Sequence, residues 1–233
     1  MVKKTSYDPG LKSQLYLARK NCKLIPNLET AFIIFSLPRV LTCPFATAMC
    51  KRKCYVAFEE RFYDNVLPAR LRNYEISKTS AFVPLMTDRI RSIANRCRKE
   101  RVITRIHEGG DFYSREYVDK WLEISNNLSD DKRVQFVAYT KSFPFFDGKS
   151  IPSNFALRVS LWADTAPEQL ALVAKNGWPT YSAVESFSSK DSFTHCRCED
   201  CATCNFCWQN YQDIRCLIHS GRQNAKKKSK DMS

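Results

Sequence analysis

Eight of the eleven cysteines in this chain fall in two short segments, and this clustering limits what the chain can fold into. The two groups are Cys43, Cys50 and Cys54, and Cys196, Cys198, Cys201, Cys204 and Cys207. Thiols this close either form disulfides or hold a metal, and the repeated two-residue gap in the second group favours a metal. The fold must therefore bring thiols that are apart in the sequence close enough to share a metal or a disulfide.

Composition and charge narrow the class of protein. A chain of 233 residues with 44% hydrophobic residues fits one domain with a substantial core. The net charge of +13 is spread along the chain and predicts a polyanionic partner, either nucleic acid or a nucleotide. Because no segment has the length of a transmembrane helix or the pattern of a secretion signal, we expect a cytoplasmic protein without membrane contact, in which thiols stay reduced.

Short apolar runs alternate with amphipathic segments along the chain. The predicted strands are residues 31–37, 102–106, 134–139, 155–161 and 180–184, with 214–218 as the sixth. The predicted helices cover residues 66–76, a segment that Ser80 caps, a segment that Ser114 caps, and a segment with a Thr165–Glu168 capping box that ends near Gly177.

Strands that alternate with helices predict a parallel sheet with right-handed crossovers. Six strands are too few for a closed eight-stranded barrel. We therefore predict an α/β fold, an open partial (βα)6-type barrel with a cysteine-rich metal-binding segment near the C-terminus. Residues 1–25 form a basic arm in this scheme. Residues 26–220 form one domain that includes the cysteine-rich segment 195–208, and residues 221–233 form a disordered basic tail.

Polar residues follow the predicted strands, and in parallel α/β folds this edge of the sheet carries function. The candidates for substrate contact or proton transfer are His107, Glu108, Lys141, Glu185 and His219. Gly109, Gly110 and Asp111 lie between a strand and a helix. Here a ligand can approach the backbone, and the alternative is a tight turn that Asp111 caps.

The two cysteine groups predict different sites. Cys43, Cys50 and Cys54 suit a [4Fe-4S] cluster with one open iron, or a zinc site completed from elsewhere. In the second group we predict Cys198, Cys201, Cys204 and Cys207 as ligands of zinc or of a second [4Fe-4S] cluster, with Cys196 or His195 as alternatives for the fourth ligand.

Several motifs resemble the gene product 88 family of phages and mobile elements. The motifs are Ser36-Leu37-Pro38, Thr42-Cys43-Pro44, the run from Cys50 to Tyr55, Gly110-Asp111-Phe112-Tyr113, the Cys201-Cys204-Cys207-Trp208 string and His219. They cover most of the chain from about residue 31 onward. The resemblance implies a protein of a phage or mobile element.

A more distant resemblance is to radical S-adenosylmethionine enzymes. These enzymes place three cysteines after the first strand and a glycine-rich acidic motif after the second. Cys43, Cys50 and Cys54 are similar to the first feature, and Gly109-Gly110-Asp111 is similar to the second. The resemblance implies that S-adenosylmethionine binds the open iron, with its amino group near the glycines. The cysteine gaps of six and three residues depart from the usual three and two.

Three hypotheses follow. The first is an iron–sulfur protein, similar to radical S-adenosylmethionine enzymes, that acts on nucleic acid or nucleotides. The second is a non-catalytic DNA- or RNA-binding protein stabilised by zinc or a cluster. The third is a protein that binds a host partner through its surface alone.

Overall fold

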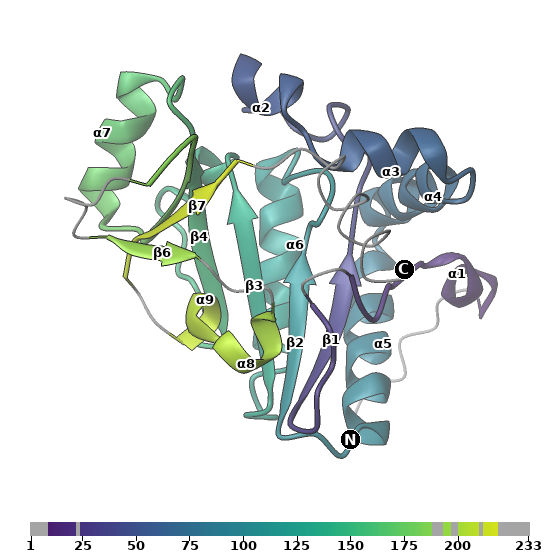
Figure 1. Ribbon diagram of the computed structural model, residues 1–233. Coiled ribbons are helices and arrows are strands. Elements are labelled where there is room, and N and C mark those ends of the chain that lie inside the picture. Colours follow the sequence, from purple (N-terminus) through teal and green to yellow (C-terminus); the bar gives the residue numbers. More distant parts are fainter. Residues whose placement is uncertain (1–8, 22–23, 188–192, 197–199, 210–211, 219–233) are drawn as a thin grey trace, which may run out of the picture.

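The computed structural model describes residues 9–21, 24–187, 193–196, 200–209 and 212–218, and its centre is one parallel sheet. The strands are β1 (Thr30–Phe35), β2 (Arg101–Ile106), β3 (Val134–Thr140), β4 (Phe155–Leu161), β5 (Thr180–Val184), β6 (Thr194–Cys196) and β7 (Ile214–Leu217). Their order is β1-β2-β3-β4-β5-β7-β6, and every neighbouring pair is parallel. The sheet curls into an open half-barrel (Figure 1), which confirms the predicted α/β class and parallel sheet.

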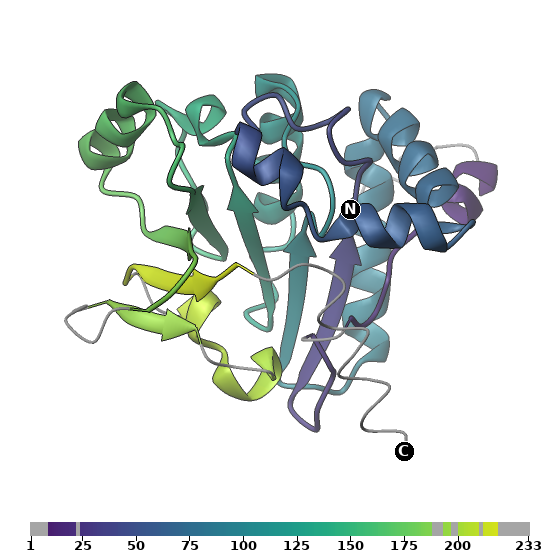
Figure 2. The same cartoon turned by 45° about the horizontal axis from the view of Figure 1, so that its top comes forward.

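Helices cover both faces of the sheet. They are α1 (Pro9–Gln14), α2 (Ala48–Arg52), α3 (Val56–Phe62), α4 (Val66–Lys78), α5 (Phe82–Arg96), α6 (Arg115–Asn126), α7 (Pro167–Asn176), α8 (Cys201–Cys204) and α9 (Phe206–Gln209), with a 3-10 turn at Phe143–Phe146. Helices α5 and α6 lie against the outer face, whereas the short helices α8 and α9 lie across the inner face (Figure 1). Figure 2 shows α2 above the ends of the central strands.

Strand β1 explains why the sheet is buried on both faces. All six of its residues are buried. Because successive side chains point to opposite faces, Ile33 and Phe35 join the outer core, while Phe32 and Ile34 join a smaller inner cluster with Trp208 of α9. The unbroken apolar run of this strand is the pattern expected of a central parallel strand.

Two of the predicted helix caps are confirmed. The Ser114 side chain accepts a hydrogen bond from the Tyr117 amide at the start of α6. Gly177 ends α7 in the left-handed conformation, with φ of 61°. An L side chain would be strained at such a φ, which is why glycine ends so many helices.

The other two predicted caps are wrong. Helix α5 begins at Phe82 with Ala81 as its N-cap, because Thr79 and Ser80 belong to the turn that follows α4. Helix α7 has Ala166 as its N-cap. The Thr165 hydroxyl instead accepts a hydrogen bond from the Trp162 amide at 2.9 Å, so it is engaged in the preceding turn.

The sheet has one strand more than the six predicted. The additional strand, β6, is three residues long and lies inside the second cysteine group. The loop after β1, where no helix was predicted, holds α2 and α3. None of the described helices is long and apolar enough to cross a membrane.

Residues 9–21, part of the predicted basic arm, lie against the domain. The backbones of Ala18 and Ile34 form an antiparallel bridge, with N···O distances of 3.0 and 2.8 Å. The buried Asn73 side chain bonds both the amide and the carbonyl of Tyr16, each at 2.9 Å. The predicted tail, residues 221–233, lies outside the described residues.

Candidate functional site

The carboxyl ends of β1 to β4 form one rim, which carries most of the residues predicted from the sequence. The loops after β1 and β2 are joined there, because the Leu37 amide donates to the Gly109 carbonyl at 2.8 Å. The first cysteine group, the loop from His107 to Asp111, and Lys141 are all at this rim.

The loop with the first cysteine group is held from both sides. The Cys43 amide donates to the Val40 carbonyl at 3.1 Å in a tight turn. Thr47 caps α2 by accepting from the Cys50 amide at 3.2 Å. Asp164, which follows β4, accepts from the Met49 amide at 2.7 Å. The loop therefore spans the rim from β1 to β4.

The three thiols of this loop are free, half-buried and close enough to influence one another's ionisation. Burial, and after it the Asp111 charge, raises the pKa of Cys43 to about 12. Burial also raises the pKa of Cys50 and Cys54, although the Lys141 charge opposes the shift at Cys50. These thiols stay protonated at neutral pH unless a metal displaces the protons.

Lys141 is a buried cation beside these thiols. It is 7% exposed, and its Nζ donates to the Ser160 hydroxyl at 2.8 Å and lies 5.2 Å from the centre of the Trp162 ring. Burial lowers its pKa, while the nearby Cys50 and then Asp111 oppose that shift. Among the residues that the structure describes, Lys141 forms no ion pair with a carboxylate.

Asp111 joins the loops after β2 and β3. Its Oδ1 accepts from the Thr140 hydroxyl at 2.5 Å and from the Phe112 amide at 2.8 Å. Its Oδ2 accepts from the amides of Lys141 at 2.9 Å and Ser142 at 3.2 Å. Burial raises the pKa of this carboxyl despite these bonds. Because a carboxylate has about four acceptor sites, protein donors already occupy those of Asp111.

The two glycines before Asp111 are packed against protein. A Cβ on Gly109 would lie 2.9 Å from the Arg70 guanidinium carbon. Gly110 has φ of 79°, and a Cβ there would lie 2.6 Å from both Leu37 Cβ and the Thr42 hydroxyl. The close approach that we predicted for a ligand is therefore made by other parts of the chain, and contact with a cofactor at these glycines stays a prediction.

His107 and Glu108 point into different surroundings. The His107 ring is 2% exposed among Phe35, Phe112 and Tyr117, and its Nε2 lies 3.0 Å from the Tyr117 hydroxyl. Burial lowers its pKa to about 3, so the ring is neutral at physiological pH.

Glu108 accepts from the Asn21 amide nitrogen at 2.7 Å, and burial raises the pKa of its carboxyl. The Tyr55 hydroxyl donates to the Glu108 carbonyl at 2.7 Å. This bond connects the loop of the first cysteine group to the acidic loop, which runs from His107 to Asp111.

Backbone strain is concentrated around the predicted sites. Three non-glycine residues among those described have a positive φ: Val40 (65°), His107 (63°) and Asn205 (46°). Val40 precedes Cys43, His107 begins the acidic loop, and Asn205 lies between Cys204 and Cys207. For a β-branched residue such as Val40 this conformation is rare, and such strain is typical of functional loops. Sequence patterns carry no signal for it.

The second cysteine group lies within the half-barrel rather than at the rim. Cys201 and Cys207 pack against the inner cluster beside Tyr139, whose hydroxyl bonds Cys207. Cys196 of β6 is the register partner of Cys216 of β7. Cys216 therefore lies beside this group.

Arg158 fixes the second cysteine group to the sheet. It is 1% exposed, and its guanidinium donates to the carbonyls of Cys207 at 2.9 Å and Gln212 at 2.7 Å. A charged residue inside the apolar run of β4 was the sequence signal for this contact.

The remaining predicted residues are not at these positions. Glu185 is exposed one residue past β5. Cys198 and His219 lie outside the described residues. Within the described part of the chain, no three Cys, His, Asp or Glu side chains are arranged closely enough to hold a metal ion, so the metal-binding character of the cysteine-rich segment has no direct structural support.

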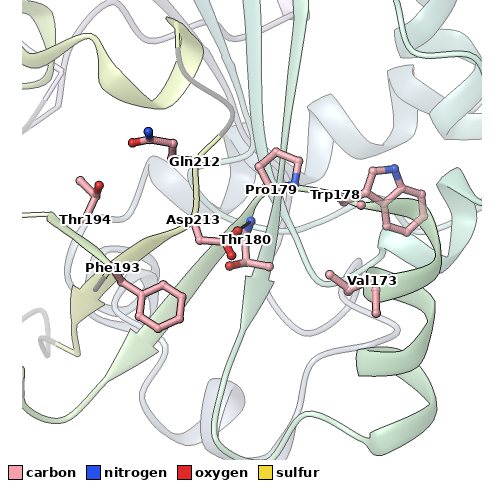
Figure 3. Close-up of a pocket in the computed structure, with 10 residues that line it drawn as sticks. Val173, Trp178, Pro179, Thr180, Phe193, Thr194, Gln212 and Asp213 are labelled. Atoms are coloured by element: carbon pink, nitrogen blue, oxygen red, sulfur yellow. Dashed lines mark hydrogen bonds between the residues drawn. The ribbon is translucent and has the colours of Figure 1, made fainter. Parts of the chain in front are cut away.

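A hollow of about 620 Å³ opens at the opposite end of the sheet (Figure 3). Thr180 and Thr194, the first residues of β5 and β6, line it together with Asp213, Trp178 and Phe193. Asp213 already accepts from the Thr180 amide at 2.7 Å. The hollow holds none of the predicted cysteines, histidines or lysines among its described lining, so we place the candidate site at the rim.

Comparisons with known proteins agree with the first resemblance. A family model described as Gene product 88 matches residues 11–210. The Gene 88 proteins of Mycobacterium phages D29 and L5 are each 33% identical over 105 residues, or 43% of this chain. The match covers 42% and 43% of those relatives, so it spans less than half of their length. No solved structure matches the chain significantly.

Proposed function

The chain belongs to the Gene product 88 family, and from that premise we propose that it is a phage iron–sulfur protein whose Cys43, Cys50 and Cys54 hold a [4Fe-4S] cluster at the rim. Three thiols on one loop leave the fourth iron open. When bound, such a cluster supplies an electron carrier with a vacant coordination position. The names of the phage relatives state no function, so the proposal is argued from the residues at the rim.

The observation that supports this proposal most strongly is the position of Lys141. A buried ammonium without a carboxylate partner costs several kcal/mol. Cys50 is the first of the groups that oppose the lowering of the Lys141 pKa, ahead of Asp111 and Asp164, but within the described residues none of them forms an ion pair with it. A thiolate-bound cluster is anionic and would add a counter-charge beside this ammonium. The exposed Lys51, Arg52 and Lys53 add positive charge on the same loop.

Binding of a cluster would have to bring the three rim thiols together, because within the described residues no three metal-binding side chains already meet. Metal sites rarely exist fully formed before the metal binds, because protonated thiols have no reason to converge. Cys43, Cys50 and Cys54 already share one loop that hydrogen bonds tie to β1 and β4. The fit of three half-buried thiols to a cluster is therefore good, whereas a zinc site would need a fourth ligand.

The experiment is anaerobic purification followed by counting of iron, zinc and sulfide per chain and a visible spectrum. We expect the rim cluster to contribute four irons and four sulfides per chain, and we expect Cys50→Ser to lose these four irons and four sulfides. Cys97→Ser is the matched control, since Cys97 ends α5 away from both groups and should leave metal content unchanged. A colourless wild-type protein without iron would refute the proposal.

Lys141→Met tests the electrostatic part of the proposal. Loss of one positive charge favours the oxidised cluster, so the midpoint potential should fall by on the order of 100 mV at an effective dielectric near 20. Protein-film voltammetry measures this shift. Lys149→Met, at an exposed ion pair with Asp119, is the control that should leave the potential unchanged. An unchanged potential in Lys141→Met would contradict the role of Lys141.

S-adenosylmethionine remains a separate proposal. The saturated Asp111 carboxylate and the filled space at Gly109 and Gly110 leave the predicted amino-group site without free acceptors. Methionine released after reduction of the loaded protein would extend the proposal to this cofactor. His107 is neutral and buried, so it would then help to position the cofactor and would not transfer a proton.

For the second cysteine group we propose a separate metal, either zinc or another cluster. Cys201 and Cys207 are supported as ligands because both face the inner cluster, and Cys196 with Cys216 provides two neighbouring thiols. Cys204→Ser and Cys207→Ser test this group, and metal content should fall more in Cys207→Ser. Equal metal content in both variants and wild type would refute a metal here.

The net charge of +13 favours a second candidate function, a nucleic-acid-binding protein in which the metals are structural. The two functions are distinguished by measuring nucleic-acid affinity in different redox states of the cluster. A protein that binds nucleic acid equally well with its cluster reduced, oxidised or replaced by zinc uses metal only for stability.

A further inference from the structure

Two aromatic side chains are exposed beside the first cysteine group. Phe62 is 60% exposed at the end of α3, and Tyr63, which follows it, is 55% exposed. The Phe62 ring packs against the Phe58 ring with centres 4.3 Å apart and planes tilted by 30°, and the Arg61 guanidinium lies 5.8 Å from the Phe62 ring centre. These contacts hold the Phe62 ring in place while leaving much of it open to solvent.

The charges around these rings are unbalanced. The two acids of α3, Glu59 and Glu60, are paired with the buried Arg70 at 2.8 and 3.0 Å. Within the described residues, no ion pair involves the exposed cations at the end of α2, namely Lys51, Arg52 and the C-cap residue Lys53. The exposed Asp64, which follows Tyr63, carries a negative charge beside the rings, so the excess of positive charge lies at Lys51, Arg52 and Lys53.

Helices α2 and α3 follow one another along the rim (Figure 2). Helix α3 has seven residues, so its axis is about 10 Å long at 1.5 Å per residue. The cations that precede this helix and the aromatic rings at its end are thus about as far apart as a few nucleotides of an extended nucleic-acid strand.

We propose that α2 and α3 bind single-stranded nucleic acid, with phosphates on Lys51, Arg52 and Lys53 and bases stacked on Phe62 and Tyr63. Bases in a duplex are stacked on each other and cannot cover these rings, whereas unpaired bases stack on aromatic side chains regardless of sequence. A protein partner would also cover apolar surface but would not require the free cations. The inference adds a partner to the proposed cluster function and does not depend on the cluster.

The test is fluorescence anisotropy of the full chain with a labelled 20-nucleotide oligothymidine over a range of salt concentrations. We expect Phe62→Ala to weaken binding by about 5- to 100-fold, the effect of one lost stacking contact. Phe193→Ala is the matched control, because Phe193 is 40% exposed and has the Arg215 guanidinium 4.0 Å from its ring centre at the other edge of the sheet. It should bind as wild type does.

The charge component has its own variant. Replacing Lys51, Arg52 and Lys53 together by Gln should reduce the slope of log K against log salt by about 2. A triple Gln variant of Arg96, Arg98 and Lys132 removes the same charge from exposed residues near the amino ends of the strands, and its slope should match wild type.

Equal affinity in Phe62→Ala and Phe193→Ala would overturn the inference. Equal affinity for the oligothymidine and for a blunt duplex of the same length would overturn it as well. Binding is measured with and without bound iron. Persistence of binding in iron-free protein supports the inference even if the cluster proposal fails, and loss of binding only without iron would show that the cluster, not α3, forms the surface.

Discussion

At the scale of single residues, Gly110 shows how tightly the rim is packed. Gly110 and Gly148 have nearly equal φ values of 79° and 76°, but only Gly110 has atoms within 4 Å of the place of a Cβ. Gly148→Ala should therefore cost about 1 kcal/mol of unfolding free energy from backbone strain alone. Gly110→Ala should cost about 1–3 kcal/mol more because of the clash. Urea denaturation measures both, and equal costs would contradict the packing.

His107 gives a second residue-scale prediction. Its pKa is about 3 in the folded protein and near 6.5 when unfolded, so the unfolded chain binds more protons between these values. The stability that the neutral ring provides is complete above pH 6.5 and is lost as the pH falls towards 3. At pH 4.5 the loss should reach about 2–3 kcal/mol.

His107→Asn tests this by removing the titrating group while tolerating the positive φ. The difference in unfolding free energy between wild type and variant should change with pH only below about 6.5. Tyr117→Phe is the control. It removes the hydrogen bond at Nε2 but not the burial that causes most of the shift, so it should keep the pH dependence. A pH-independent difference for His107→Asn would contradict the prediction.

At the scale of elements, the segment with α8 and α9 depends on Arg158. Arg158→Met leaves the carbonyls of Cys207 and Gln212 without their donor, which should cost about 1–3 kcal/mol. Hydrogen exchange should accelerate in residues 200–217 and remain slow in β1 to β3.

Arg91→Met is the control for this element. Arg91 forms an exposed ion pair with Asp130 at 2.9 Å, and such pairs contribute about 1 kcal/mol or less. Uniform acceleration of exchange across the whole sheet in Arg158→Met would show that the segment is not a separate element.

At the scale of the whole molecule, the two faces of the sheet should unfold together. Adjacent residues of β1 alternate between the outer core, which contains Trp121, and the inner cluster, which contains Trp208. Loss of either cluster exposes the same strands. In single-tryptophan variants that retain only Trp121 or only Trp208, the fluorescence midpoint in urea should coincide with that of far-UV circular dichroism. An earlier midpoint for Trp208 alone would show that the inner segment detaches first.

The whole fold was more predictable than its details. Strand β1 was recognised because its apolar residues form an unbroken run, which is the pattern of a parallel strand buried on both faces. Strand β6 was missed because Thr194-His195-Cys196 has no apolar period and gains its place only by pairing with β7. The caps at Ser80 and Thr165 failed because nearby turns use those residues first.

The site was predictable as a list of residues but not as a geometry. The rule that strand ends gather on one edge placed the first cysteine group and Lys141 together. No sequence pattern reveals that Lys141 is buried without an ion pair, that protein donors fill Asp111, or that Cys216 lies beside Cys196. These depend on contacts between residues far apart in the chain.

The place of β7 between β5 and β6 has a consequence for synthesis on the ribosome. Strand β6 leaves the exit tunnel before the strand that it pairs with, and β5 keeps an unpaired side until β7 follows. At about 5–20 residues per second, this open edge persists for a few seconds in every nascent chain. Translation that pauses between residues 184 and 214 should therefore favour aggregation or chaperone capture, and the Cys196 thiol of β6 would be exposed before its neighbour on β7 exists.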